Sequence, residues 1–256
     1  MRIVKQPNQA TACAIIIGNE ILSGRTQDAN LAIIGKKCDA LGIRLTETRI
    51  IADVEADIIT TVNGCRTGFT YVFTTGGIGP THDDITAAAI AKAFNVELVR
   101  NSEAAAALDR YYEPGHLNEA RLKMADIPAG ARLIDNPVSG APGFQLENVF
   151  VLPGVPAIME AMFDGLANRL VGGEPILTEN VVTNLVESVI ASDLGALQER
   201  YPDVSMGSYP YFRKGKLGVN LVLRATDAAR INAAADELAA TILRLKGEVL
   251  NRHSPA

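Results

Sequence analysis

The chain has 256 residues, of which 48% are hydrophobic, enough for one sizeable core and a second small domain. Its 24 basic and 29 acidic residues give a net charge of −5 without a long basic run, which disfavours an electrostatic nucleic-acid binder. The three cysteines, Cys13, Cys38 and Cys65, are odd in number and unclustered in apolar segments, which argues for reduced core thiols and against disulfides or a zinc site.

The first apolar run, 12–17, follows Arg2 and Lys5, as in a signal peptide. It is too short for one and no small-residue cleavage site follows, so it predicts a first strand. No stretch is long enough to span a membrane. With no targeting signal, we expect a cytoplasmic protein that contacts no membrane.

Strands alternate with helices over about the first ninety residues, with strands expected at 12–17, 43–52 and 70–75. Asp28 can cap the first long helix and Gly42 ends it, while the second helix runs to about Gly64. This alternation predicts parallel strands joined by crossovers, hence an α/β fold of three layers, a mostly parallel sheet with helices on both faces. In such folds the ligand lies beyond the carboxyl ends of the strands.

The third strand runs into the sequence GGIGPTHDDIT, Gly76 to Thr86, before an alanine-rich helix. Glycines at 76, 77 and 79 allow positive φ and bring bare amides close to a ligand, and the start of the following helix favours an anion. Asp83 and Asp84 are expected in the first turn of that helix, where they would repel a phosphate unless a cation sat between them. The segment therefore predicts a phosphate site with a Mg²⁺-type ion.

Alternatively, first-turn aspartates often start helices without any ligand, and glycine turns often end strands that bind nothing. His82 is more typical of a solvated turn residue than of a phosphate donor.

A fourth strand, 148–152, is broken by Pro153-Gly154 before a helix expected over 158–170. We expect the Pro153-Gly154 loop to lie at the same edge of the sheet as the glycine turn, the loop at Gly18–Glu20 and Asp53. Between these strands we expect helices over 102–112 and 117–125 and a long turn over 136–143. Arg121 and Lys123 are expected to face solvent, although over the cradle they can neutralise a second phosphate.

A boundary is predicted at the Gly172–Pro175 segment, which divides the chain into domains 1–171 and 172–256. The second is a small α+β domain, with strands expected over 179–187 and 218–225 and helices over 192–201 and 227–245. Arg213–Lys216 is expected to decorate a hairpin turn, and the last residues, 251–256, to fray.

Several motifs in this order resemble the MoaB/Mog-type molybdopterin-binding domain, and more closely the N-terminal part of competence/damage-inducible protein A (CinA). They are Gly18–Gly24, Asp53, the GGIGPTHDDIT run and Leu152–Pro156. Asn118–Ala125, Ile127-Pro128 and Asn136–Phe144 also resemble the version in eukaryotic FAD synthases. The resemblance covers about residues 12–170 strongly and implies that the remainder is a KH-like domain.

This resemblance implies chemistry at a pyrophosphate. In molybdopterin-inserting relatives the domain adenylylates molybdopterin with ATP and Mg²⁺, with essential aspartates that match Asp53 and Asp84. In competence-protein relatives a metal-dependent ADP-ribose pyrophosphatase activity is attributed to it, and FAD hydrolysis to the FAD-synthase version. The amidase and FAD-forming domains of these relatives have no counterpart here, so their activities are not expected. Ser139-Gly140 in place of Gly-Thr, and Ile158 in place of a glutamate, depart from the pattern and leave the substrate open.

The leading hypothesis is a metal-dependent hydrolase of a dinucleotide-like pyrophosphate, with Mg²⁺, Mn²⁺ or Co²⁺ as cofactor. Asp84, Asp53 and Asp83 are the candidate catalytic residues, and Asp84 and Asp53 the candidate metal ligands. The candidate ligand-binding residues are Gly18, Asn19, Glu20, Thr75, Gly76, Gly77, Gly79, Thr81, Arg121, Lys123, Pro153 and Gly154. The alternatives are a molybdopterin adenylyltransferase and a noncatalytic nucleotide- or pterin-binding protein. The expected partner is a small nucleotide or pterin phosphate, and a homo-oligomer is expected because relatives usually associate.

Overall fold

The computed structural model describes residues 10–213 and 215–253. The chain divides into two compact units, one ending at Gly173 and one beginning at Glu174, two residues after the boundary predicted at 171/172. Within the described residues, no helix is both long and apolar enough to cross a membrane.

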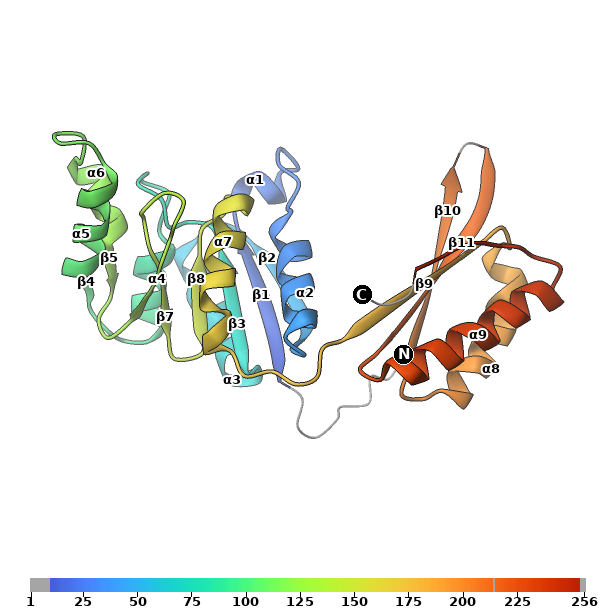
Figure 1. The fold of residues 1–256 in the computed structure, drawn as a ribbon. Helices are drawn as coiled ribbons and strands as arrows, with labels where there is room; N and C mark the ends of the chain where they lie inside the picture. Colours follow the sequence, from blue (N-terminus) through green and yellow to red (C-terminus); the bar gives the residue numbers. More distant parts are fainter. Residues whose placement is uncertain (1–9, 214, 254–256) are drawn as a thin grey trace. The chain divides into compact units, whose positions relative to one another are not determined.

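A six-stranded sheet forms the centre of the first unit (Figure 1). Its strand order is β2 (Arg44–Ile51), β1 (Thr11–Ile17), β3 (Tyr71–Thr75), β8 (Val149–Leu152), β7 (Gly143–Leu146) and β6 (Arg132–Ile134). The first four strands are parallel, whereas β7 and β6 are antiparallel additions. The register places Thr75 beside Ile16 on one side and Leu152 on the other, so β1, β3 and β8 end together. The predicted α/β class with a mostly parallel sheet is therefore confirmed.

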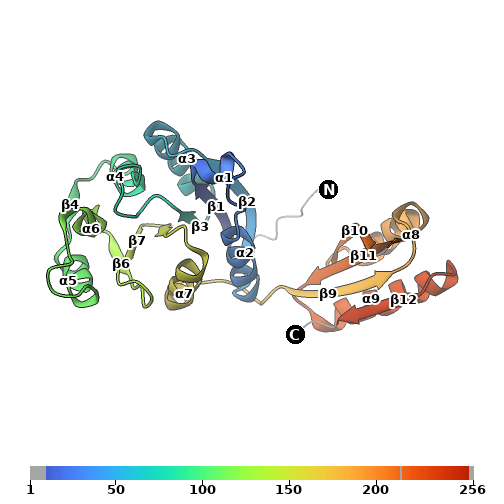
Figure 2. The ribbon, with the colours of Figure 1, turned by 90° about the horizontal axis from the view of Figure 1, so that it is seen from above.

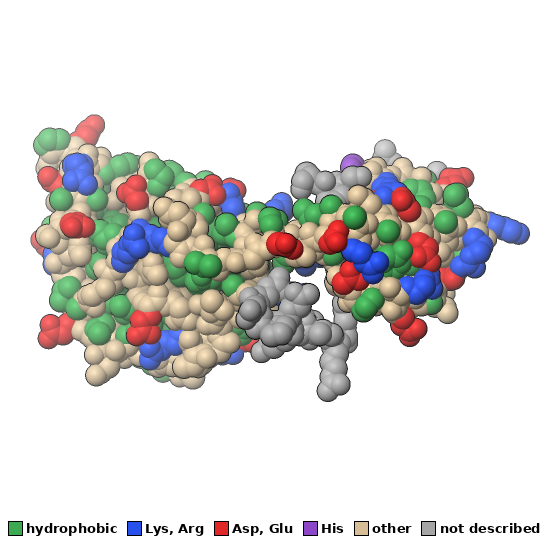
Figure 3. All heavy atoms as spheres, turned by 60° about the horizontal axis from the view of Figure 1, so that its bottom comes forward, with side chains coloured by type: hydrophobic (Ala, Val, Ile, Leu, Met, Phe, Trp, Pro, Cys, Tyr) green, Lys and Arg blue, Asp and Glu red, His purple; other side chains and the backbone are tan. Residues whose placement is uncertain are grey.

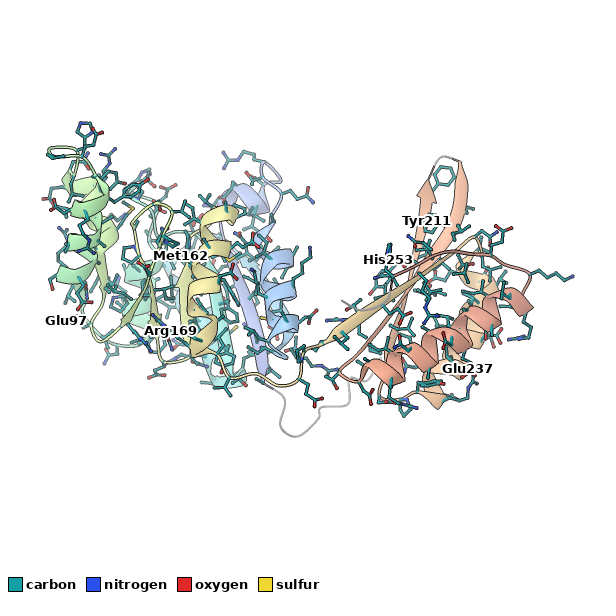
Figure 4. All side chains as sticks on the ribbon, viewed as in Figure 1. Glu97, Met162, Arg169, Tyr211, Glu237 and His253 are labelled. Carbon is teal, nitrogen blue, oxygen red and sulfur yellow. The ribbon has the colours of Figure 1, made fainter. Side chains whose placement is uncertain are left out.

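Helices cover both faces of this sheet. They are α1 (Asn19–Leu22), α2 (Asn30–Ala40), α3 (Glu55–Gly68), α4 (Thr86–Ala93) and α7 (Pro156–Leu166), which continues as the 3-10 turn η2 (Ala167–Arg169). Figure 2 shows α2 and α7 on one face and α3 and α4 on the other. On the α2 and α7 face, the ring of Phe73 lies 5.4 Å from that of Phe150 and 5.0 Å from that of Phe163. At the end of η2, Arg169 donates to the backbone oxygen of Leu133 at 2.8 Å (Figure 4).

A small lobe of the first unit was only partly predicted. It comprises β4 (Leu98–Arg100), α5 (Ser102–Tyr111), α6 (Glu119–Leu122), the 3-10 turn η1 (Lys123–Ala125) and β5 (Asp126–Pro128), with β4 and β5 paired antiparallel. The helix expected over 117–125 is wrong in length, because Asn118 caps a single α-helical turn at the N–H of Arg121 and the chain then tightens into η1. The tightening turns Lys123 toward the sheet edge described below.

The second unit has the order β9 (Leu177–Thr183), α8 (Glu187–Arg200), β10 (Ser205–Arg213), β11 (Lys216–Ala225), α9 (Ala228–Arg244) and β12 (Val249–His253). Its antiparallel sheet has the order β10-β11-β9-β12. This β-α-β-β-α-β connectivity is ferredoxin-like. The small α+β class is confirmed, with β11 placed between β10 and β9, and the KH-like likeness stays a prediction.

Within the second unit, the Asp227 side chain caps α9, and β10 and β11 form the predicted hairpin, although Lys214 lies outside the described residues. Residues 251–253, expected to fray, belong to β12, while 254–256 lie outside the described residues. The Tyr211 hydroxyl donates to the Thr183 backbone oxygen at 3.1 Å, and Glu237 on α9 pairs with Arg200 on α8 at 2.5 Å (Figure 4). Acidic and basic side chains are interspersed on the face drawn in Figure 3.

The three cysteines are buried and free. Burial raises the pKa of Cys38 to about 12. The Sγ atoms of Cys13 and Cys65 lie 3.5 Å apart, and the hydrogen bond between them raises the pKa of Cys13 while lowering that of Cys65.

Candidate functional site

Three strand ends converge at Gly76. Its N–H donates to the oxygen of Leu152 at 3.1 Å, which ties the turn to the end of β8. Its φ is +101°, and a Cβ placed there would lie 2.2 Å from the backbone oxygen of Ile17 at the end of β1. A Cβ on Gly154 would lie 3.5 Å from the Cα of Gly76. Only glycine at position 76 lets these three backbones meet.

The next three residues form the turn in which we predict the anion cradle. Gly77, Ile78 and Gly79 lie between β3 and α4, and none of their N–H groups donates to another group among the described residues. Gly77 has a φ of +68°, and a Cβ there would lie 2.2 Å from Oγ1 of Thr86. The Thr86 hydroxyl in turn donates to the oxygen of Gly76 at 3.0 Å and fixes the turn against α4. We predicted that Gly76 would offer its amide, but the sheet occupies it, so the available amides are those of 77–79.

Asp83 and Asp84 precede α4 rather than lying in its first turn. The helix begins at Thr86, because residues 81–84 form a turn of their own with the Asp84 N–H on the Thr81 oxygen. The Thr81 N–H donates to Oδ2 of Asp84 at 2.8 Å. The Thr81 hydroxyl lies 2.6 Å from Oδ1 of Asp83 and 2.5 Å from Oδ2 of Asp84, so its single hydrogen serves one carboxylate at a time. This contact lowers the pKa of Asp83, with a smaller contribution from Lys123.

Lys123 reaches the cradle, contrary to the solvent-facing position that we expected. Its Nζ donates to the backbone oxygen of Thr81, which anchors the ammonium group next to the turn that carries Asp84. Arg121 points elsewhere, since it donates to the oxygen of His116 and its guanidinium lies 4.3 Å from the centre of the Tyr112 ring. Of these two predicted cations, the structure brings only Lys123 to the site.

A pocket of about 110 Å³ adjoins the cradle, and we call it the α4 pocket. Its polar wall contains Gly77, Gly79, Asp84, Lys123 and Asp126. The remaining wall is apolar and is formed by Ile78, Ala87, Ala88, Leu98, Met124, Ile127, Pro142 and Phe144. An apolar pocket beside free amides, two carboxylates and one ammonium suits a flat ring that carries a phosphate.

The acidic loops after β1 and β2 are tied to each other. Oδ2 of Asp53 accepts from the N–H of Asn19 at 2.8 Å, which fixes the start of α1 against the end of β2. The exposed Glu20 folds back, so that a Cβ on Gly18 would lie 2.6 Å from its Oε1. Asp53 lines neither of the two pockets described at this edge.

The predicted metal needs few protein ligands if it is of the magnesium type, because such ions keep several waters and bind substrate phosphates. No three His, Cys, Asp or Glu side chains gather in metal-binding geometry within residues 10–213 and 215–253. Asp84 nevertheless suits such an ion, since only its Oδ2 is held by Thr81 and it lies beside the cradle that would hold the phosphates.

Two residues of this edge were missed in the sequence. Asp126 lines the α4 pocket and is paired with Arg100, whose Nη2 lies 3.2 Å from its Oδ2. Asn30 is only 4% exposed and shares the buried stripe of α2 with Ile34 and Cys38. An asparagine at helical spacing within an apolar stripe was the signal that could have identified it.

Comparison with known proteins agrees with this geometry. Residues 13–172 match the family described as "Probable molybdopterin binding domain", and residues 175–246 match "FAD synthase, middle domain". Residues 175–246 match a separate family of domains, which agrees with the division of the chain after Gly173.

Individual relatives extend these matches. A protein of Archaeoglobus fulgidus is 38% identical over 77% of this chain and 84% of its own length. A "Probable FAD synthase" of Caenorhabditis elegans is 30% identical over 93% of this chain, a match that spans 51% of that protein. A solved structure of a CinA protein of unknown function from Thermoplasma acidophilum has a TM-score of 0.60 at 34% identity, over 63% of this chain and 98% of that one. The chain therefore belongs to the molybdopterin-binding-type domain family, and its relatives include FAD synthases and CinA proteins.

Proposed function

We propose that the protein is a metal-dependent hydrolase of a dinucleotide-like pyrophosphate of the ADP-ribose or FAD class. The observation that carries the proposal is the run of three unpartnered N–H groups at 77–79, next to Asp84 and Lys123. Free amides in a row bind phosphate oxygens, and the ammonium of Lys123 neutralises part of their charge.

The α4 pocket supports a substrate that has a flat ring as well as phosphates. Its wall is mostly apolar, with Phe144, Ile127 and Leu98 among the lining side chains, and it opens directly onto Gly77 and Gly79. Adenine and isoalloxazine rings both meet that description. The relationship to a protein described as a probable FAD synthase supports the same substrate class.

In the proposed reaction, a water oxygen forms a new bond to one phosphorus and the bridging P–O bond breaks. ADP-ribose would give AMP and ribose 5-phosphate, and FAD would give AMP and FMN. The amides of 77–79 and Lys123 would hold the phosphates, and Asp84 would hold the divalent ion. The ion supplies Lewis-acid polarisation of a phosphoryl oxygen. Asp53 would act indirectly, by holding α1 at the same edge through Asn19.

The family description also supports adenylyl transfer to a pterin phosphate at the same cradle. The two reactions differ in the acceptor, which is water in one case and a pterin phosphate in the other. Incubation with ATP and molybdopterin separates them, because only a transferase yields adenylylated pterin. A noncatalytic binding protein would bind nucleotide tightly without metal and give no product.

Product analysis by chromatography tests the proposal. The pure protein is incubated with ADP-ribose or FAD and with Mg²⁺, Mn²⁺ or Co²⁺. We expect AMP from the wild type and a loss of about 100-fold or more in Asp84→Asn, because removing a charge that acts in the transition state costs several kcal/mol. Asp109→Asn, an exposed carboxylate on α5, is the matched control and should keep full activity. Full activity in folded Asp84→Asn would contradict the assignment.

A further inference from the structure

A second pocket lies at the same sheet edge and plays no part in the proposed reaction. It has a volume of about 70 Å³, and we call it the α2 pocket. Its walls include Ile17, Glu20, Asp28, Asn30, Thr75 and Gly154. It therefore lies among the ends of β1 and β3 and the starts of α2 and α7.

The two pockets lie on opposite faces of the sheet. Thr75 alternates with Thr74 on β3 and so shares the face of Phe73, which packs against α2 and α7 in a core that includes Met162 (Figure 4). The α4 pocket belongs to the other face, with Phe144 and Ala87. Gly76 and Gly77 form the short stretch of backbone between Thr75 in one pocket and Ile78 in the other.

Two buried polar groups of the α2 pocket have no partner. Asn30 donates through Nδ2 to the oxygen of Gly154 at 2.8 Å, which fixes the orientation of its amide and leaves Oδ1 without a partner in the described structure. Thr75 is 1% exposed, and its Oγ1 is also without a partner there. Unsatisfied buried polar atoms destabilise a fold, so two of them from separate elements in one pocket point to a ligand group.

The chemistry of the walls selects the kind of group. Oδ1 of Asn30 and the carboxylates of Glu20 and Asp28 only accept hydrogen bonds, so an anion is disfavoured and a donor is needed. Thr75 offers a buried hydroxyl that both donates and accepts, and the exposed Thr26 and Gln27 in the same wall can also do both. A ligand hydroxyl can donate to Asn30 and accept from Thr75, whereas an aromatic amine only donates.

We propose that the α2 pocket binds the sugar hydroxyls of the substrate arm that lies beyond the pyrophosphate, and that Asn30 and Thr75 recognise them. The inference rests on the proposed function in one respect, because the phosphates are taken to cross the turn at 76–79. The substrate then straddles the sheet edge, with its ring in the α4 pocket and a ribose or ribityl chain in the α2 pocket. Specificity for the two arms resides on opposite faces of the sheet.

The test compares two valine variants of neighbouring threonines in the full chain. Thr75→Val removes the hydroxyl from the α2 pocket. Thr74→Val removes an equally buried and unpartnered hydroxyl on the opposite face, outside both pockets. Because neither hydroxyl has a partner among the described residues, both variants should keep the wild-type melting temperature or exceed it.

Binding is measured by calorimetry, which needs no turnover, with ADP-ribose and with the pentyl ester of ADP, whose apolar chain replaces the sugar. We expect Thr75→Val to bind ADP-ribose about tenfold more weakly than Thr74→Val, and the two variants to bind the pentyl ester equally. Equal binding of ADP-ribose by both variants would overturn the proposal. An equal loss with both ligands would also overturn it, because Thr75 would then act on the phosphates.

A further binding experiment uses the inosine analogue of ADP-ribose, which lacks the exocyclic amine of the base. If the difference between the variants disappears with this analogue, the pocket binds the amine of the base and the sugar assignment is wrong. If ADP-ribose binds but is not hydrolysed, the proposed reaction is refuted. The comparison of Thr75→Val with Thr74→Val then still tests whether the α2 pocket binds the sugar. Failure of the wild type to bind ADP-ribose at all would overturn both proposals.

Discussion

Replacement of Gly76 by alanine tests the cradle most directly. The added Cβ would lie 2.2 Å from the oxygen of Ile17, and this gap must open by about 0.8 Å to reach 3.0 Å. The turn has little room to move away, because Gly154, in the loop after β8, packs against Gly76 and the Gly76 N–H is bonded to the oxygen of Leu152. The substitution should therefore displace the free amides of 77–79 by roughly 1 Å.

Two costs follow, and they can be separated. The positive φ should cost about 1–2 kcal/mol in any L-residue, and the forced shift about 1–3 kcal/mol more. Together these should lower the melting temperature by about 4–20 °C in a domain of this size. A displacement of about 1 Å at a reacting phosphate should reduce kcat/KM for ADP-ribose by about 100-fold.

Gly130→Ala is the matched control. Gly130 has a φ of +80° in the loop between β5 and β6, and a Cβ there would meet nothing within 4 Å. It should lose about 2–8 °C from the backbone strain alone and keep its activity. If Gly76→Ala turns over ADP-ribose within about threefold of Gly130→Ala, the cradle does not position the phosphates and the reasoning is refuted.

Three further substitutions extend the tests. Phe73→Ala should destabilise the first unit by about 3–5 kcal/mol in urea unfolding, because Phe73 is fully buried between Phe150 and Phe163; a loss below about 1 kcal/mol would show that this cluster is not packed as described. Lys123→Met should raise KM by about 10-fold or more, whereas Lys92→Met, which removes an ion pair with Glu55 outside the α4 pocket, should not; equal KM values would remove Lys123 from the site. Burial raises the pKa of Cys38 from 9.0 to about 12. The contribution of this protonated thiol to the free energy of unfolding is therefore complete below pH 9.0 and is lost as the pH rises toward 12. Between pH 8 and pH 10 the wild type should therefore lose about 1.4 kcal/mol more in urea unfolding than Cys38→Ala, and identical losses would contradict that pKa.

Helices and strands in which apolar residues form a run or recur at regular spacing could be predicted from the sequence, and short or atypical elements could not. The strands β1, β3 and β8 are apolar runs followed by glycine or proline, and the apolar residues of the helices between the first strands recur at helical spacing. The strand β4 has only three residues, all exposed, and therefore shows no alternation. The strand β10 contains Pro210, which has no backbone N–H, and it tolerates this residue because it lies at the edge of its sheet.

The candidate site divides in the same way. The glycine turn, Asp84 and the strand-end loops follow from local sequence, because each lies directly after a strand. The positions of Lys123 and Arg121 do not, since they depend on how tightly the chain turns between α6 and β5. The occupied amide of Gly76 also escaped prediction, because only the register of β8 beside β3 shows which oxygen that amide meets.

A cradle of backbone amides recognises a phosphate but does not distinguish one phosphate-bearing ligand from another. The N–H groups of 77–79 can hold a phosphate whether it belongs to a nucleotide or to a pterin, because every residue except proline offers the same group. Discrimination must therefore come from the pocket walls. The α4 pocket is mostly apolar, whereas the α2 pocket presents carboxylates, amide groups and threonine hydroxyls. If substrate choice lies there, exchanging wall residues such as Thr75 will change which pyrophosphate is bound, while exchanging Gly76 will weaken binding of every one of them.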